Sequence, residues 1–441
     1  MGTVEITGIG VVHPLGKGVK GYWNNLVAGQ CSFTEVSPDR RGNSPSKIGA
    51  ELHSFSLSSL FKKGKGLDRL WPRPVQLGLA AAAYALEDAG INVPEKRNRL
   101  GLIVGTSVGN LETAFEFRDA WKASGRPPPP HTAFFSFHHS IASVVSAELD
   151  VRGPCYTISQ GCNSGMDALG LACSLIKAGS CDAVLVIGSD NELTPEVMAA
   201  LNGSSSLSSR YNAEPQKALR PFDAERDGNV LGEGACAYLL EDSSQVESRH
   251  GRAYARVNGF SITCAGGGRQ YSAADPKLET NTFKRAILQA VGVSGADTLD
   301  IPYVVCANGS GSKLYDRLEA VVLNELLVHN AYHQIFSIKG AVGQHGAPSA
   351  ALQIVSSALC LATDIVPPTL NLDSPIPELS GLNVVTAAQR RIAPNIICNS
   401  IGLGGFFYSA VSLTVSPYAH HQKQDITWGE MRLAFSDEAW V

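Results

Sequence analysis

The alternation of short Val- and Ile-rich runs with longer helical segments constrains the fold of this chain more than any other feature. The runs occupy residues 4–12, 100–107, 183–190, 235–242, 302–310, 395–400 and 409–415. Their length and their β-branched residues are typical of buried strands. Helical patterns, such as those at 74–90 and 166–179, separate several of them. This alternation predicts an α/β fold with mixed, largely buried sheets.

The segment 166–179 shows how such a helix is recognised. Met166, Leu169, Cys173 and Ile176 recur at spacings of three and four, which places them on one face. The opposite face carries Ala and Ser rather than charged residues. A helix with small residues all round is expected to be buried on most sides.

A weak internal duplication is visible as a repeated order of strand, small-residue turn and helix. The first copy is 154–165 followed by 166–177, and the second is 302–312 followed by 314–327. In both copies a residue capable of chemistry lies at the turn between strand and helix. The repeat predicts a fold made of two duplicated halves.

A polar stretch at 243–251 separates the two copies. We therefore expect an N-terminal half at 1–247, a C-terminal half at 248–416 and a tail at 417–441. The tail is less regular, and it is either an interaction segment or a segment that packs on the body. We expect packing.

Composition excludes several classes of protein. The chain has 441 residues, 44% of them hydrophobic and 17% charged, with a net charge of −4. A globular protein with a large core fits these values, whereas nucleic-acid binding needs a basic footprint. No basic-then-apolar leader and no long apolar span is found, so we expect a cytoplasmic location without a membrane partner. None of the ten cysteines forms a CxxC pair or a zinc-finger spacing, so no metal is expected.

One cysteine differs from the others. Cys162 lies in the segment 157–169, TISQGCNSGMDAL, where a strand pattern ends, a Gly-containing turn follows and a helix begins. The positive end of a helix dipole and its free N–H groups favour a thiolate. A thiolate attacks thioesters without a strong adjacent base. Cys162 is therefore either a nucleophile or one more buried core cysteine.

At this point the sequence resembles a known family. The segment 157–169 is similar to the nucleophile motif of β-ketoacyl-ACP synthases, whose cysteine falls on Cys162. The segments 4–16, 220–242 and 399–413 also fit the family, so the resemblance covers about residues 3–415. Elongating synthases and type II polyketide ketosynthases look most similar. The resemblance implies a thiolase-like five-layered αβαβα fold.

The family implies two histidines beside the cysteine, which bind the malonyl thioester carbonyl and stabilise the enolate formed on decarboxylation. This chain departs from that pattern. The motif of the first histidine reads ANGSGSKLYDRLEA, which places Asn308 at its position. The acidic pair of the motif remains, as Asp316 and Glu319, with an expected structural role near the site.

The second histidine motif reads SIKGAVGQHGAPSAA. Counted from Lys339, the family histidine falls on Gln344, and His345 comes one residue later. A shift of register would bring His345 into the site. Lys339 matches a family lysine, with either a catalytic role or a structural ion pair. Amides donate hydrogen bonds but do not titrate near neutrality, so they preserve acyl binding better than decarboxylation.

Other family positions concern the pocket. The resemblance implies an oxyanion hole made by the backbone N–H groups of Cys162 and Leu403. The substrate gate is altered, because Ile401 and Leu403 replace the usual phenylalanines and Phe406 follows a double glycine. The implied partners are an acyl carrier protein and a second subunit, in a homodimer or in a heterodimer with another ketosynthase-like chain. Apart from the carrier's phosphopantetheine arm, no cofactor is implied.

Three functions are compatible with these residues. The first is an acyltransferase that loads Cys162 and transfers, cyclises or releases the acyl group without decarboxylative elongation, in polyketide or fatty-acid-type specialised metabolism. The second is a decarboxylative synthase with a non-standard triad. The third is a non-catalytic partner subunit similar to chain-length factors, although those usually lose the cysteine. We expect the first.

Overall fold

A computed structural model provides the structure of the chain. It describes residues 2–53, 55–59, 71–91, 93, 98–127, 129–266, 276–293, 296–327, 332–402 and 407–419. Most of the tail expected at 417–441 therefore lies outside the described residues. Within the described residues, no helix has both the length and the apolar character that crossing a bilayer requires.

The first half of the chain contributes five neighbouring strands. They are β1 (Val4–His13), β5 (Leu100–Gly105), β6 (Cys155–Ile158), β7 (Ala183–Asn191) and β8 (Leu231–Asp242). Their order in the sheet is β6-β5-β7-β8-β1. Strand β5 is parallel to β6 and β7, whereas β8 is antiparallel to both β7 and β1. Numbered along the chain, this order is third, second, fourth, fifth, first.

The second half repeats this pattern strand for strand. It contains β9 (Ala255–Cys264), β10 (Val304–Cys306), β11 (Gln334–Phe336), β14 (Asn395–Ile401) and β15 (Phe407–Thr414). Their order is β11-β10-β14-β15-β9, with β10 parallel to both neighbours and β15 antiparallel to both of its own. Strands β1 and β9 pair briefly and join the two sets. The expected duplication into two halves is therefore confirmed at the level of topology.

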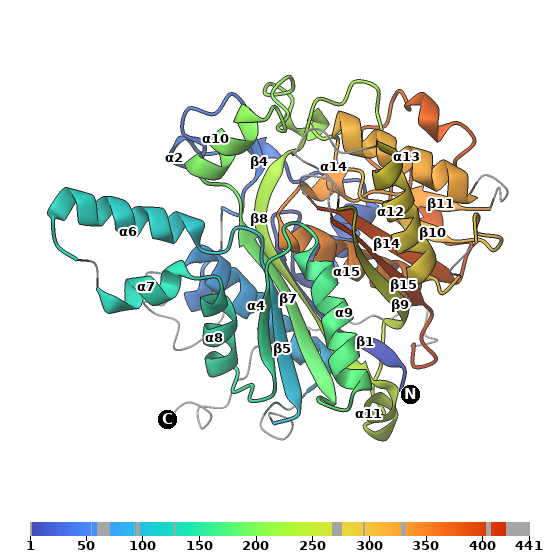
Figure 1. The fold of residues 1–441 in the computed structure, drawn as a ribbon, viewed down its shortest axis with the longest axis horizontal. Helices are drawn as coiled ribbons and strands as arrows, with labels where there is room; N and C mark the ends of the chain where they lie inside the picture. The colour runs from blue at the N-terminus through green and yellow to red at the C-terminus, as the bar shows by residue number, and fades with distance from the viewer. Residues whose placement is uncertain are drawn as a thin grey trace.

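Helices form three layers around the two sets of strands. Helices α9 (Ser164–Lys177) and α15 (Ala347–Thr363) lie between the sets and contact strands of both (Figure 1). Helices α4 (Arg73–Ala89) and α8 (His139–Glu148) cover the outer face of the first set, and α12 (Pro276–Ala290) and α13 (Lys313–Leu327) cover the second. This α-β-α-β-α order confirms the predicted five-layered fold.

The remaining elements are short or peripheral. They are β2 (Gly16–Lys17), α1 (Gly18–Val27), β3 (Thr34–Glu35), α2 (Pro38–Arg41), β4 (Ile48–Ala50), α6 (Leu111–Ser124), α7 (Pro130–Ser136), α10 (Pro195–Gly203), α11 (Ser243–Ser248), α14 (Lys339–Val342), β12 (Ile365–Val366) and β13 (Gln389–Arg390). Helices α6 and α7 project from the body (Figure 1). No residue of α6 is buried.

Small residues decide how closely the layers approach. The predicted apolar face of α9, formed by Met166, Leu169, Cys173 and Ile176, is buried in the central core. In β1, a Cβ added to Gly10 would lie 2.0 Å from the Ala81 carbonyl oxygen of α4, so only glycine permits this contact. The glycines of the first strand motif therefore have a packing role.

Candidate functional site

Five of the predicted site residues meet at one cavity of about 460 Å³. Its lining includes Cys162, Asn308, Lys339, Gln344 and Ile401, which come from both halves of the chain. The loops 204–207, 227–229 and 312–315 form the rest of its wall. A second cavity of about 400 Å³, within residues 372–386, has a lining of apolar residues, proline, one serine and one threonine, with no cysteine and no titratable group. Chemistry is therefore expected at the first cavity.

Cys162 lies where the sequence pattern predicts it, between the end of β6 and the start of α9. The side chain is 8% exposed. The following residue, Asn163, donates from Nδ2 to the Phe407 carbonyl oxygen at 3.1 Å and accepts at Oδ1 from the Ser400 hydroxyl at 2.7 Å. These bonds tie the nucleophile turn to β14 and β15 of the other half. The helix N-terminus and the duplicated half together position the sulfur.

The loop that carries Asn308 is held by two buried carboxylates. The Asn308 and Gly309 N–H groups donate to Glu319 at 2.7 and 2.8 Å, and the Ser310 N–H donates to Asp316 at 2.8 Å. Burial raises the pKa of Glu319 to about 7 and raises that of Asp316 as well, while these N–H groups oppose the shift. Both acids thus shape the loop behind Asn308 rather than face the cavity.

Lys339 determines which way the Asn308 amide points. Its Nζ donates to Asn308 Oδ1 at 2.7 Å, and a flipped amide would set two donors against each other. Asn308 Nδ2 makes no hydrogen bond within the part of the chain that the structure describes. Burial lowers the pKa of Lys339, whereas attraction to a thiolate on Cys162 and to Glu319 raises it. The lysine therefore donates a hydrogen bond to the Asn308 amide and also interacts electrostatically with a thiolate on Cys162.

Gln344, and not His345, lines the cavity. The Gln344 backbone bridges Val230 and Gly232, with N–H···O distances of 2.8 and 2.9 Å, so its register is set by both neighbours. Gln344 Oε1 is buried and has no hydrogen-bond partner among the described residues. The expected position of the second histidine is thus occupied by an amide with an unused acceptor.

His345 points away from the cavity into the core. It is fully buried, and its Nε2 lies 3.0 Å from Nε2 of His13 in β1. Since His13 Nδ1 accepts from the Leu15 N–H, the tautomer that donates from His13 to His345 satisfies this pair. Burial lowers the pKa of His345 to about 3 and that of His13 well below its usual range. Both rings are neutral near pH 7.

Two comparisons of the sequence agree with this geometry. The model of the β-ketoacyl synthase N-terminal domain matches residues 1–246, and that of the C-terminal domain matches residues 254–373. A protein described as putative polyketide beta-ketoacyl synthase 1, from Streptomyces halstedii, is 34% identical over 424 residues, which cover 93% of this chain and 97% of that protein. The chain belongs to the β-ketoacyl synthase family.

Solved structures confirm the fold of this β-ketoacyl synthase. One is a type II polyketide synthase acyl-carrier protein in complex with its ketosynthase, with a TM-score of 0.81, 24% identity and coverage of 94% of this chain and 99% of the other. Another is the ishigamide ketosynthase/chain length factor, with a TM-score of 0.82, 23% identity and coverage of 94% and 99%. At these identities the similarity establishes the thiolase-like architecture.

The remaining predicted site residues concern the gate. Ile401, at the end of β14, lines the cavity, and its N–H lies 3.4 Å from Asn308 Oδ1. Leu403 and Phe406, predicted for the oxyanion hole and the gate, lie outside the described residues. Their roles stay predictions.

Sequence reasoning missed one buried carboxyl group of the ketosynthase cavity. Glu192 follows β7, is 5% exposed and lines the same cavity as Cys162. The sequence signal was an acidic pair, Asp190 and Glu192, directly after a strongly apolar strand run. The described residues include no group of three or more His, Cys, Asp or Glu side chains placed to bind a metal.

Proposed function

We propose that this ketosynthase-type protein accepts an acyl group on Cys162 from a carrier thioester and transfers or releases it without decarboxylative elongation. The observation that carries the proposal is the pair of amides, Asn308 and Gln344, that lines the same cavity as Cys162. Amides donate to a carbonyl or an oxyanion, but neither acquires positive charge beside an enolate. Acyl binding is retained by such a site, whereas decarboxylation loses its charge stabilisation.

The orientation of Asn308 supports this assignment. Because Asn308 Oδ1 accepts from Lys339, its Nδ2 is the atom available to a substrate carbonyl. Loss of one well-placed donor typically costs about a hundredfold or more in rate, so a retained donor at this position preserves much of the acyl-transfer chemistry. We further propose that the Cys162 and Leu403 N–H groups form the oxyanion hole.

We propose an acyl carrier protein as the donor and a dimer as the functional form. The similar structure of a ketosynthase in complex with its acyl-carrier protein supports the first partner, and the similar ketosynthase/chain length factor supports a second ketosynthase-like subunit. The phosphopantetheine arm would then enter the cavity beside the loop 312–315. The pathway would be polyketide or fatty-acid-type specialised metabolism.

Condensation by His345 is the main alternative. The contact of His345 with His13, away from the lining of the cavity, argues against it. A partner subunit without catalysis is a further alternative, and the retained Cys162 at a helix N-terminus argues against that one.

The test combines intact-mass measurement with carbon dioxide release. The protein is incubated with acyl-carrier-protein thioesters and with malonyl-carrier protein, with Cys162→Ala as the control. Acylation that needs Cys162 and occurs without carbon dioxide release is expected. Carbon dioxide release with a lengthened product would instead establish an elongating synthase, and absence of acylation would favour the partner subunit.

A further inference from the structure

Glu192 gives the cavity a buried carboxyl group that the proposed mechanism does not yet use. Its neighbour Asp190 is saturated, because the N–H groups of Ser107, Val108 and Ala347, among others, donate to its two oxygens. The Glu192 carboxyl group instead lies against Gly346, and Glu192 belongs to the lining of the cavity. It is a carboxyl group in the lining of a cavity that also includes Cys162 and the two amides.

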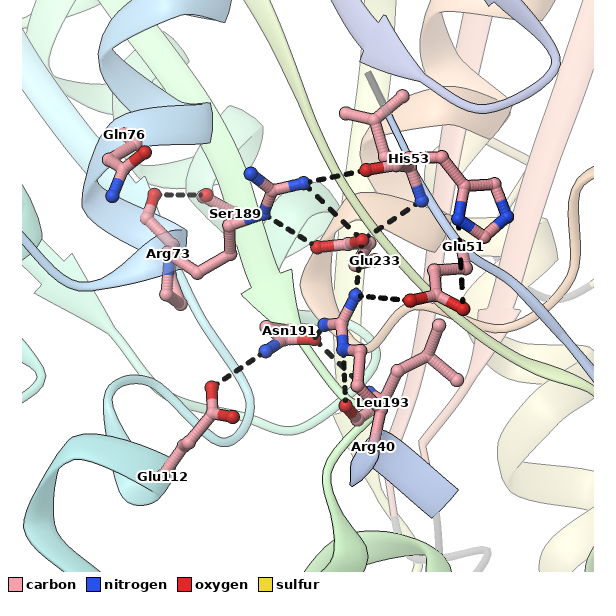
Figure 2. Close-up of polar contacts among 12 residues, drawn as sticks. Arg40, Glu51, His53, Arg73, Gln76, Glu112, Ser189, Asn191, Leu193 and Glu233 are labelled. Carbon is pink, nitrogen blue, oxygen red and sulfur yellow. Dashed lines mark hydrogen bonds and ion pairs between the residues drawn. The ribbon is translucent and has the colours of Figure 1, made fainter. Parts of the chain in front are cut away.

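One arginine holds the residues on both sides of Glu192, through the side chain of Asn191 and the backbone of Leu193. Arg40 donates to Asn191 Oδ1 at 2.7 Å and to the Leu193 carbonyl oxygen at 3.2 Å (Figure 2). Arg40 in turn donates to the Glu233 carboxylate at 2.6 Å. Glu233 also accepts a hydrogen bond from Arg73 at 2.8 Å. This network positions Glu192 with little freedom of its main chain.

Gly346 fixes the side chain from the other direction. A Cβ at Gly346 would lie 2.8 Å from Glu192 Oε1, and the residue has a φ of +67°. Because residue 346 is a glycine, the Glu192 carboxyl group can approach the loop that carries Gln344 and His345. The Glu192 carboxylic acid and the Gln344 amide therefore belong to the lining of the same cavity.

The surroundings of this carboxyl group favour its protonated form. Burial raises the pKa of Glu192 well above its usual range, and the charge of Asp190 raises it further. The charge of Lys339 and the Gly346 N–H act in the opposite direction. A protonated carboxylic acid donates through one oxygen and accepts through the other. Neither Asn308 nor Gln344 can move a proton in this way.

We propose that Glu192 is the proton-transfer residue for acyl transfer from Cys162 to a protic acceptor, an alcohol or water. This inference rests on the proposed function and deepens it. The acceptor oxygen forms a bond to the acyl carbon, and the bond from that carbon to Cys162 Sγ breaks. The acceptor proton moves to one Glu192 oxygen, while the proton on the other oxygen moves to Sγ. The Glu192 carboxylic acid is regenerated, and Cys162 is released from its acyl group as a thiol.

The test compares two acceptors on the same acyl-enzyme. Cys162 is loaded with octanoyl-N-acetylcysteamine, and the intact mass follows loss of the octanoyl group to 1-butanol or to free N-acetylcysteamine at a series of pH values. The thiol brings its own ionised form and needs no proton acceptor. The variants are Glu192→Gln, Glu192→Asp and, as a matched control, Glu196→Gln, which removes an exposed carboxylate on α10.

We expect Glu192→Gln to slow transfer to butanol about a hundredfold, the usual scale of general acid–base catalysis, and to flatten its pH profile. Loading and transfer to the thiol should change little, Glu192→Asp should restore part of the rate, and Glu196→Gln should match the wild type. Equal slowing of transfer to both acceptors, or no slowing at all, would overturn the proposal. A wild-type acyl-enzyme inert to butanol and water would overturn it too.

The melting temperature of each variant separates a lost proton from a lost fold. A Glu192→Gln protein that melts with the wild type and still loads Cys162 is folded at the site. Failure of the proposed function is recognised separately, as carbon dioxide release from malonyl-carrier protein by the wild type. That result would leave the butanol comparison to decide the role of Glu192 alone.

Discussion

Replacing Lys339 by Met tests the surroundings of the nucleophile most directly. The Lys339 ammonium is 1% exposed, donates to Asn308 Oδ1 at 2.7 Å and attracts a thiolate on Cys162. A nearby opposite charge lowers a pKa by about 1–3 units, and one such unit corresponds to roughly a tenfold change in the thiolate fraction near neutral pH. We expect Lys339→Met to slow alkylation and acylation of Cys162 by roughly tenfold or more near neutral pH.

The stability of this variant should change less than its reactivity. Burial lowers the pKa of Lys339, so the charged form is disfavoured by its surroundings and Met relieves that cost. The Asn308 carbonyl loses its main donor, which opposes the gain. Because these effects offset each other, we expect the free energy of unfolding to change by no more than about 2 kcal/mol.

Intact-mass time courses with iodoacetamide and with an acyl-carrier thioester provide the assay. The matched control is Lys177→Met. It removes an exposed lysine at the last turn of α9, the helix that begins directly after the Cys162 turn. The difference between wild type and Lys339→Met should shrink at alkaline pH, since the buried ammonium loses its proton there. An alkylation rate equal to that of the wild type near neutral pH would refute the reasoning.

Three further predictions concern the supports of the site. Glu319→Gln should lower the free energy of unfolding by about 1–3 kcal/mol in urea titrations, because an amide leaves one buried loop N–H unsatisfied; an unchanged midpoint would contradict this. The buried pair His13 and His345 has lowered pKa values, so the folded state binds fewer protons than the unfolded chain below about pH 6.5. Stability should be full above that pH and fall as pH drops, and His345→Asn should flatten the fall in urea titrations; a slope equal to that of the wild type would count against it. Gly346→Ala should lower the melting temperature for two reasons. The φ of +67° at this position is strained for alanine, which costs about 1–3 kcal/mol. In addition, the new Cβ would lie 2.7 Å from Asp190 Oδ2. A melting temperature equal to that of the wild type would show that this loop can relax.

Local sequence patterns were sufficient for the elements and for the position of Cys162. The apolar runs and the periodic face of α9 predicted buried strands and a buried helix, because burial on both faces requires such residues wherever the element lies. The turn before α9 predicted Cys162 at a helix N-terminus, since strand end, glycine and helix start are all local features. The repeated order of strand, turn and helix predicted two halves.

Local patterns failed to predict where one strand ends, because side chains from a distant helix accept hydrogen bonds from backbone N–H groups that strand pairing would otherwise use. The strand expected over 302–310 is only Val304–Cys306, because Glu319 and Asp316 take the N–H groups of the following loop. Those carboxylates lie on α13, and their direction depends on how that helix packs. The periodicity of a strand cannot report such a contact.

The tertiary structure alone decided which groups face the nucleophile. Gln344 and His345 are adjacent in the chain, and pairing of the Gln344 backbone with both Val230 and Gly232 turns one side chain to the cavity and the other to His13. Glu192 joins the cavity only because β7 ends beside the amide loop of the other half. The sequence by itself determined the α/β elements, their duplication and the turn that carries Cys162, since these depend on local burial and turn chemistry. Which side chains of the site can donate or accept a proton depends on contacts between the two halves, and these contacts form only when the chain folds.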